Sequence, residues 1–262
     1  MLIGSAFIYL KGCMNKKIIP QDLTISVEAK NLKPHLLSLD FAFGCGMVPS
    51  DWELARQPIG TDNIAQLIFT NGIAITAEPQ RIIFAQPIRN VDRLEVVIPE
   101  IARKYTNVLS NLEFEAIRIN FRSYVPFEEQ DSARQYITQT LLSPGTWQSV
   151  GETPPHASVE LVYNLQRAPF YLKITEAALQ ETEEKVTPII IFNGSFSYQV
   201  NGESNAEKLA VVHSVINNWQ SDLSDYQNII NNKFLAQVAQ KEQVLATNGF
   251  NPEANNLFAV SA

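Results

Sequence analysis

Three polar side chains that could bind an anion follow one another along a predicted strand. Residues 114–124 alternate between apolar and polar types, and the polar members include Arg118, Asn120 and Arg122. Alternate residues of a strand point to the same face, so these three heads are neighbours. Guanidinium groups in such a row can bind a carboxylate or a phosphate. Alternatively, this is the solvent side of a half-buried strand, where the arginines pair with a cross-strand acid such as Glu160.

The cysteines and histidines predict no second site. Cys45 lies between two glycines after a predicted strand, which would leave its thiol accessible, but only His35 is close enough in sequence to act as its base. A free, unreactive thiol is the favoured interpretation. The histidines are far apart, and none has a second ligand at metal-binding spacing; they are His35, His156 and His213. We therefore predict no metal and no cofactor.

Familiar catalytic and nucleotide-binding motifs are absent from the sequence. It contains no G-x-x-x-x-G-K-[ST], G-x-G-x-x-G, H-E-x-x-H or G-x-S-x-G pattern. The chain has 262 residues, 45% of them hydrophobic, and a formal net charge of −7. Nucleic-acid binding depends on Lys and Arg facing phosphates, and the basic cluster of Lys11, Lys16 and Lys17 is short. The composition thus predicts a folded, acidic protein for which nucleic acid is an unlikely partner.

The first residues share only some features of an export signal. Residues 2–10 are mostly apolar and precede Cys13, but no basic residue comes before them, and Lys11 stands where such a signal needs a small residue. We therefore expect residues 1–13 to be an N-terminal extension. Two cysteines in so long a chain are typical of the reducing cytoplasm, which is the expected location. No apolar run reaches about 18 residues, so no transmembrane helix is expected.

The first part of the chain, residues 14–143, reads as strands followed by helix, strand and helix. Alternating apolar residues predict a strand over 36–43. Asn71-Gly72 predicts a hairpin with a type I′ turn, and a third strand follows at 81–85. Pro99 is expected to open a helix, and Asp131-Ser132 to cap another one.

The second part, residues 156–249, also runs from antiparallel strands into helix. Strands are predicted over 159–165 and 170–174, and a hairpin at Asn193-Gly194. A long helix follows, over 205–247, and Asn248-Gly249 is expected to be its C-cap. The proline-containing stretch 144–155 is the only plausible internal boundary. Together the two parts predict an α+β fold, mainly antiparallel sheet with helices on one face and a long C-terminal helix. The chain is expected to form either one compact unit or two closely packed halves that share an architecture, without a repeat at the level of residues.

The long helix carries the clearest pattern in the sequence. Apolar residues recur at alternating spacings of three and four, which places them on one stripe; they are Leu209, Val212, Ile216, Trp219, Leu223, Tyr226 and Ile230. Such a stripe is buried either in the core of its own chain or in an interface with a second copy or another protein.

Function is least determined by the sequence. Because the strongest feature is a burial stripe and no catalytic motif is present, the favoured interpretation is a non-catalytic interaction or scaffold protein. The alternative is a module that binds a small ligand or anion through the arginine row. A second alternative is an enzyme whose site is assembled from scattered residues.

Overall fold

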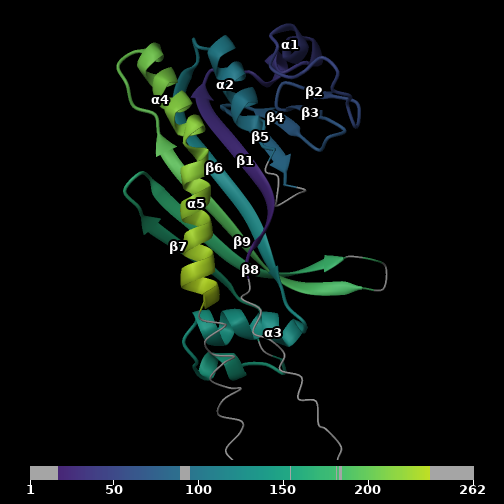
Figure 1. Ribbon diagram of the computed structural model, residues 1–262, viewed down its shortest axis with the longest axis vertical. Coiled ribbons are helices and arrows are strands. Elements are labelled where there is room, and N and C mark those ends of the chain that lie inside the picture. Colours follow the sequence, from purple (N-terminus) through teal and green to yellow (C-terminus); the bar gives the residue numbers. More distant parts are fainter. Residues whose placement is uncertain (1–16, 89–94, 154, 181, 183–184, 237–262) are drawn as a thin grey trace, which may run out of the picture.

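A single sheet of nine antiparallel strands organises the protein. The structure is a computed structural model that describes residues 17–88, 95–153, 155–180, 182 and 185–236. The strand order is β2-β3-β4-β5-β1-β6-β9-β8-β7 (Figure 1). The strands are β1 Ile19–Lys30, β2 Ile59–Gly60, β3 Ala65–Ile68, β4 Ala74–Glu78, β5 Arg81–Pro87, β6 Glu113–Pro126, β7 Ser158–Asn164, β8 Pro169–Gln180 and β9 Val186–Gln199. The predicted α+β class with mainly antiparallel sheet is confirmed.

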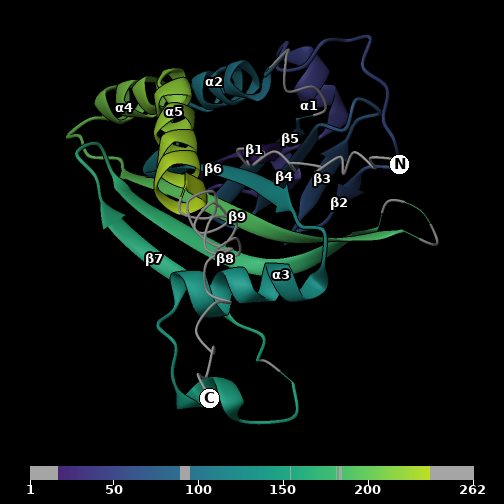
Figure 2. The same cartoon turned by 60° about the horizontal axis from the view of Figure 1, so that its bottom comes forward.

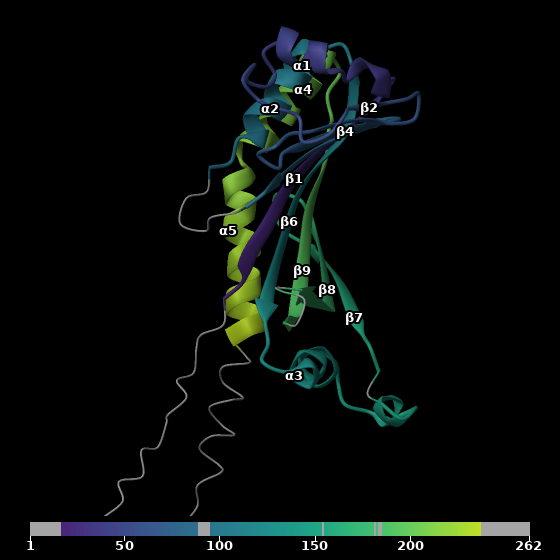
Figure 3. The same cartoon turned by 90° about the vertical axis from the view of Figure 1, so that its right-hand side faces the viewer.

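Helices cover one face of this sheet. The α-helices are α1 Leu39–Gly44, α2 Ile98–Val108, α3 Gln130–Gln135, α4 Asn205–Asn217 and α5 Trp219–Ile229. Short 3₁₀ or π turns span Pro34–Leu36, Tyr136–Leu141, Thr146–Ser149 and Ile230–Leu235. α2, α4 and α5 lie on the same side of the sheet, and α3 lies near its lower end (Figure 3). We call the side under α2, α4 and α5 the covered face and the opposite side the uncovered face.

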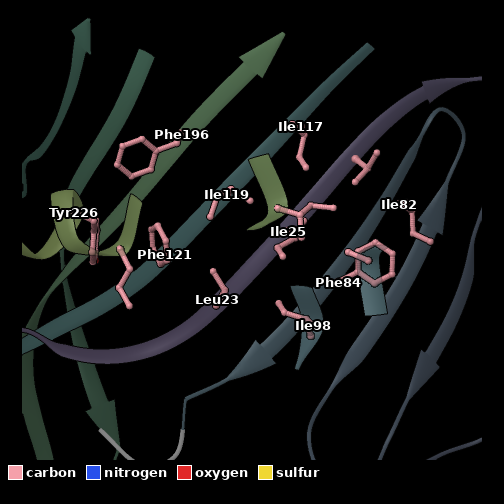
Figure 4. Packing of buried hydrophobic residues seen from close by; sticks show 14 of the residues in the cluster. Leu23, Ile25, Ile82, Phe84, Ile98, Ile117, Ile119, Phe121, Phe196 and Tyr226 are labelled. Carbon is pink, nitrogen blue, oxygen red and sulfur yellow. The ribbon is translucent and has the colours of Figure 1, made fainter. Parts of the chain in front are cut away.

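The core lies between the sheet and these helices. Alternating residues of β1, β5, β6 and β9 point into it and meet side chains of α2 and α5 (Figure 4). The buried residues include Leu23, Ile25, Ile82, Phe84, Ile98, Ile117, Ile119, Phe121, Phe196 and Tyr226. The predicted strand over 114–124, with its apolar residues on the buried side, is confirmed as β6. The strands of both residue ranges, 14–143 and 156–249, belong to the same sheet.

The central strand β1 was not predicted from the sequence. It lies between β5 and β6 and so connects the two sides of the sheet. It pairs with β5 on one side and β6 on the other. Leu23, Ile25, Val27 and Ala29 are fully buried and alternate with polar residues, which is the pattern of a strand with one covered face.

The predicted strand over 36–43 is wrong, because this segment forms a 3₁₀ turn and then helix α1. Ser38 is the N-cap of α1, and its hydroxyl accepts a hydrogen bond from the Phe41 amide at 3.1 Å. This bond satisfies a backbone donor at the start of the helix, which an extended chain would not need. Within α1 only Ala42 is buried. The alternating residues Leu39, Phe41 and Phe43 are partly buried against the core and do not form one face of a strand.

The hairpin at Asn71-Gly72 is confirmed, but its turn is not type I′. β3 and β4 pair antiparallel across it, with Ile68 opposite Ala74. Gly72 has a positive φ of 90°, whereas Asn71 does not, and type I′ requires positive φ at both residues. The Asn71 Oδ1 instead accepts a hydrogen bond from the Ile73 amide at 3.0 Å, which stabilises a different turn.

The hairpin predicted at Asn193-Gly194 is wrong. Both residues lie in the middle of β9, which runs without interruption from Val186 to Gln199. A Cβ atom added to Gly194 would come within 2.5 Å of Tyr226 Cδ2 and 2.8 Å of Phe170 Cε2. Glycine is therefore present because an aromatic ring of α5 packs directly against the strand, not because the chain turns.

The C-terminal helix is divided at Asn218. The single helix predicted over 205–247 is wrong within the described residues, where α4 ends at Asn217 and α5 begins at Trp219. The Asn218 side-chain amide donates to the Ser214 carbonyl at 3.0 Å, so it competes with the helical hydrogen bonds. Residues 237–249, with the expected cap at Asn248-Gly249, lie outside the described residues.

Of the two other predicted helix starts, one is correct and one is wrong. Pro99 lies in the first turn of α2, as predicted. α3 begins two or three residues earlier than expected: its N-cap is Glu129, and no side chain caps it. The cap predicted at Asp131-Ser132 is therefore wrong.

Candidate ligand-binding face of the sheet

The uncovered face carries a grid of polar side chains set by the strand register. In one row across the sheet, Asp22 of β1, Arg122 of β6, Asn193 of β9 and Lys173 of β8 are opposite one another in turn. Cross-strand neighbours of this kind lie about 5 Å apart. The next row contains Thr24, Asn120, Ser195 and Tyr171, and the row after it contains Ser26, Arg118 and Ser197. Arg118, Asn120 and Arg122 are thus neighbours on one open, polar surface, as the alternation predicted.

Arg118 is already engaged inside the protein. Its guanidinium hydrogen-bonds to the Glu28 carboxylate of β1 and forms an ion pair with it. Ser26, directly opposite Arg118 in the register, is buried. The cross-strand acid that neutralises Arg118 is therefore Glu28; Glu160, the acid named from the sequence, pairs with Lys173 at 2.6 Å.

Arg122 differs from Arg118 in having its charge available. Its side chain is exposed, and among the described residues it makes no hydrogen bond and no ion pair. The acid opposite it in the register is Asp22, whose pKa is raised because burial outweighs the opposing effect of the Arg122 charge. An exposed guanidinium without a hydrogen-bond or ion-pair partner among the described residues can bind an anion from outside.

Neutral donors and an aromatic ring surround Arg122. Asn193 is opposite it on β9, and Lys173 is one strand further, held by Glu160. In the adjacent row Asn120 is half-buried, and Tyr171 is 47% exposed. The patch offers hydrogen-bond donors at strand spacing, with one free cation among the described residues at its centre.

The covered face holds a second polar group, which the sequence did not reveal. Asp222 of α5 is 0% exposed. Its Oδ1 accepts a hydrogen bond from the Tyr198 hydroxyl at 2.7 Å and lies 3.1 Å from Arg167 Nη2. Arg167 also pairs with Asp225 at 2.5 Å. Burial raises the pKa of Asp222, against the lowering effects of Tyr198 and Arg167.

The contacts of this second group attach helix α5 to the sheet. Asp222 and Asp225 are three residues apart, so the sequence places them on one side of α5. Asp222 is buried and Asp225 is half-buried, and this difference depends on the contacts of Asp222 with β9 and with the β7–β8 turn. Arg167, in that turn, spans both acids. The cluster fixes α5 to the sheet. Predicting it from the sequence would have required the register of β9, which places Tyr198 next to Asp222.

The apolar stripe of the C-terminal helices packs within its own chain. Val212, Ile216, Leu223, Tyr226 and Ile230 are buried, and Leu209 and Trp219 are half-buried against the same core. Tyr226 stacks on Phe121 with ring centroids 5.3 Å apart. Its hydroxyl donates to the Phe192 carbonyl at 2.9 Å and is also hydrogen-bonded to Ser123, which therefore acts as the donor. This surface is occupied by the sheet.

The histidines and the described cysteine do not form a reactive group. His156 Nδ1 contacts Glu176, but Nε2, the nitrogen that a general base would present, lies 3.2 Å from Arg134 Nη2. His213 Nε2 lies 3.1 Å from Thr106 Oγ1 and links α4 to α2. Cys45 is a free, half-buried thiol. In the part of the chain that the structure describes, no cluster of His, Cys, Asp and Glu could hold a metal.

Two further observations complete the description of the chain. Over the described residues, no helix has the length and apolar character required to pass through a bilayer. No protein-family model matches the chain, and no curated protein matches its sequence.

Proposed function

We propose that this chain is a non-catalytic interaction protein that binds an acidic side chain of its partner at Arg122, on the uncovered face. The observation that supports this is the exposed guanidinium of Arg122, which has no hydrogen-bond or ion-pair partner among the described residues. Arg118, two residues away on the same strand, has such a partner in Glu28. The strand backbone fixes the position of Arg122, so binding has to order only one flexible side chain.

The neighbours of Arg122 favour a carboxylate on an extended segment. Asn193 and Lys173 continue the row at strand spacing, so a chain lying across the strands would meet a donor at about every 5 Å. Tyr171 and Val162 add exposed apolar area beside this row. A contact made by one exposed cation is weak and sensitive to salt. A small-anion module is the alternative, and it uses the same arginine.

The proposal places the protein in the cytoplasm. Its support is the low cysteine content, two in 262 residues, together with the free thiol of Cys45. Cytoplasmic thiols remain reduced, whereas secreted chains tend to use their cysteines in disulfides.

A titration with matched ligands and matched variants tests the proposal. The probe is the peptide Ac-Thr-Glu-Thr-Glu-Thr-NH₂, its control is the same peptide with Gln for both Glu, and amide shifts in NMR spectra report binding. We expect the Glu peptide to perturb β6, β8 and β9 and to bind less tightly as salt is added. Arg122→Ala should lose this binding, and Arg118→Ala should retain it.

Three outcomes separate the alternatives. Equal binding of the Glu and Gln peptides, or equal loss in both variants, would contradict the proposal. Inorganic phosphate that binds at Arg122 when the Glu peptide does not would favour the small-anion module instead.

A further inference from the structure

The two edges of the sheet are built differently. At one edge, β2 consists of Ile59–Gly60 only and directly follows Pro58. At the other, β7 runs over Ser158–Asn164 and, within the described chain, pairs with β8 alone. Short strands and prolines are devices that keep an edge from pairing with another chain. The β2 edge has both devices.

Among the described residues, the β7 edge lacks the proline and the short length that protect the β2 edge. The sequence from 158 to 164 contains no proline, lysine or arginine, and its register with β8 continues without a bulge. Its single charge, Glu160, is held by Lys173 of the neighbouring strand. A strand of this length leaves a row of backbone N–H and C=O groups without strand partners, and such a row is a template for another strand.

Apolar side chains are exposed on both sides of this edge. On the uncovered face Val162 is 60% exposed, beside Tyr171. On the covered face Val159, Leu161 and Tyr163 are only half-buried, because the helices do not extend over β7. Figure 2 shows β7 at the margin of the sheet, beyond α4 and α5. Addition of one more strand would bury apolar area on both faces.

We propose that two copies of this chain pair through β7, antiparallel and about a two-fold axis at Leu161, so that one sheet continues through the dimer. A two-fold axis is the commonest symmetry of protein dimers. Centring the pairing on Leu161 is the register that uses the whole strand, because this residue is the midpoint of Ser158–Asn164. This interaction is independent of ligand binding at Arg122.

The strand is complementary to itself in this register. On the covered face Leu161 would meet Leu161 of the second copy, and Val159 would meet Tyr163, which is a favourable pair of a β-branched and an aromatic residue. On the uncovered face Glu160 would meet Val162, and Ser158 would meet Asn164. No two like charges are opposite each other. This self-complementarity selects a second copy over an unrelated extended peptide.

Charge variants at the axis test the interaction in the full-length protein. By sedimentation equilibrium, the wild type should dimerise with increasing concentration. Leu161→Lys places two ammonium groups opposite each other in place of an apolar contact, so its dissociation constant should rise by about tenfold or more. Val162→Lys, the matched control, faces Glu160 of the second copy and should remain dimeric. A mixture of Leu161→Lys with Leu161→Glu should restore association.

Cysteine variants test the register even if Leu161→Lys fails to fold. Leu161→Cys should form a disulfide-linked dimer under mild oxidation, because the residue meets itself at the axis, whereas Val162→Cys should not. A wild type that stays monomeric at all concentrations would overturn the proposal. So would dimerisation of a folded Leu161→Lys variant, or crosslinking of Val162→Cys without that of Leu161→Cys.

Discussion

The two faces of the sheet differ in how charged side chains are placed on them. On the covered face Asp222 is fully buried, and its Oδ1 contacts both Tyr198 and Arg167. On the uncovered face Arg122 is exposed and, among described residues, has no hydrogen-bond or ion-pair partner. A buried charge without partners is strongly destabilising, whereas an exposed one costs little. On the covered face the Asp222 Oδ1 therefore has partners within the chain, although its Oδ2 has no hydrogen-bond partner among the described residues. The uncovered face can present its charge to a ligand.

The largest expected difference between the faces concerns two tyrosines. Tyr226→Ala should lower the free energy of unfolding by roughly 3–5 kcal/mol, because it empties a buried site. Tyr171→Ala removes the same side chain from the uncovered face and should cost no more than about 0.5 kcal/mol. Chemical denaturation of both variants measures this. Equal losses would show that the uncovered face is also part of the core.

The next largest effect is expected at Gly194. Gly194→Ala should destabilise by roughly 1–3 kcal/mol, because its methyl group would overlap the Tyr226 ring. Gly60→Ala is the control, since a Cβ there meets nothing within 4 Å. In the Tyr226→Ala background the cost of Gly194→Ala should decrease, because the two sites are coupled. An unchanged cost in that background would disprove the packing explanation.

Asp222 should make stability depend on pH. Burial raises its folded pKa, so the folded state binds the proton more tightly than the unfolded state. The stabilising contribution is complete below the unfolded pKa of about 3.9 and is lost as pH rises through the folded value, with a slope of at most about 1.4 kcal/mol per pH unit. Asp222→Asn should abolish this decline. Tyr198→Phe should extend it to higher pH, because it removes a hydrogen bond that favours the carboxylate. Denaturation between pH 4 and 7 would detect a contrary trend.

The smallest expected effect concerns the two arginines of β6. Arg118→Ala breaks a partly exposed ion pair and should cost up to about 1 kcal/mol, whereas Arg122→Ala should change stability by less than about 0.5 kcal/mol. Arg122→Ala should also raise the pKa of Asp22 further, because the Arg122 charge lowers it in the native protein. NMR titration of the Asp22 carboxyl checks this; an unchanged pKa would mean that the two groups do not interact.

Sequence patterns predicted local structure better than long-range packing. The alternation over 114–124 correctly located β6 and the face that carries Arg118, Asn120 and Arg122. Its partner acid was not predictable, because Glu28 lies 90 residues away on a strand whose pairing depends on the whole sheet. Gly194 was misread because a glycine beside an asparagine is typical of a turn, while its actual cause is the Tyr226 ring from a distant helix.

The most direct test of the central claim compares three arginines in one experiment. Side-chain guanidinium NMR signals of Arg118, Arg122 and Arg167 would be followed while Ac-Thr-Glu-Thr-Glu-Thr-NH₂ is added to the wild-type protein. Arg118 and Arg167 already hold acids of their own chain, so we expect the Arg122 signal alone to shift and saturate. A shift of Arg167 or Arg118 without one of Arg122, or no shift at all, would contradict the assignment of ligand binding to Arg122 on the uncovered face.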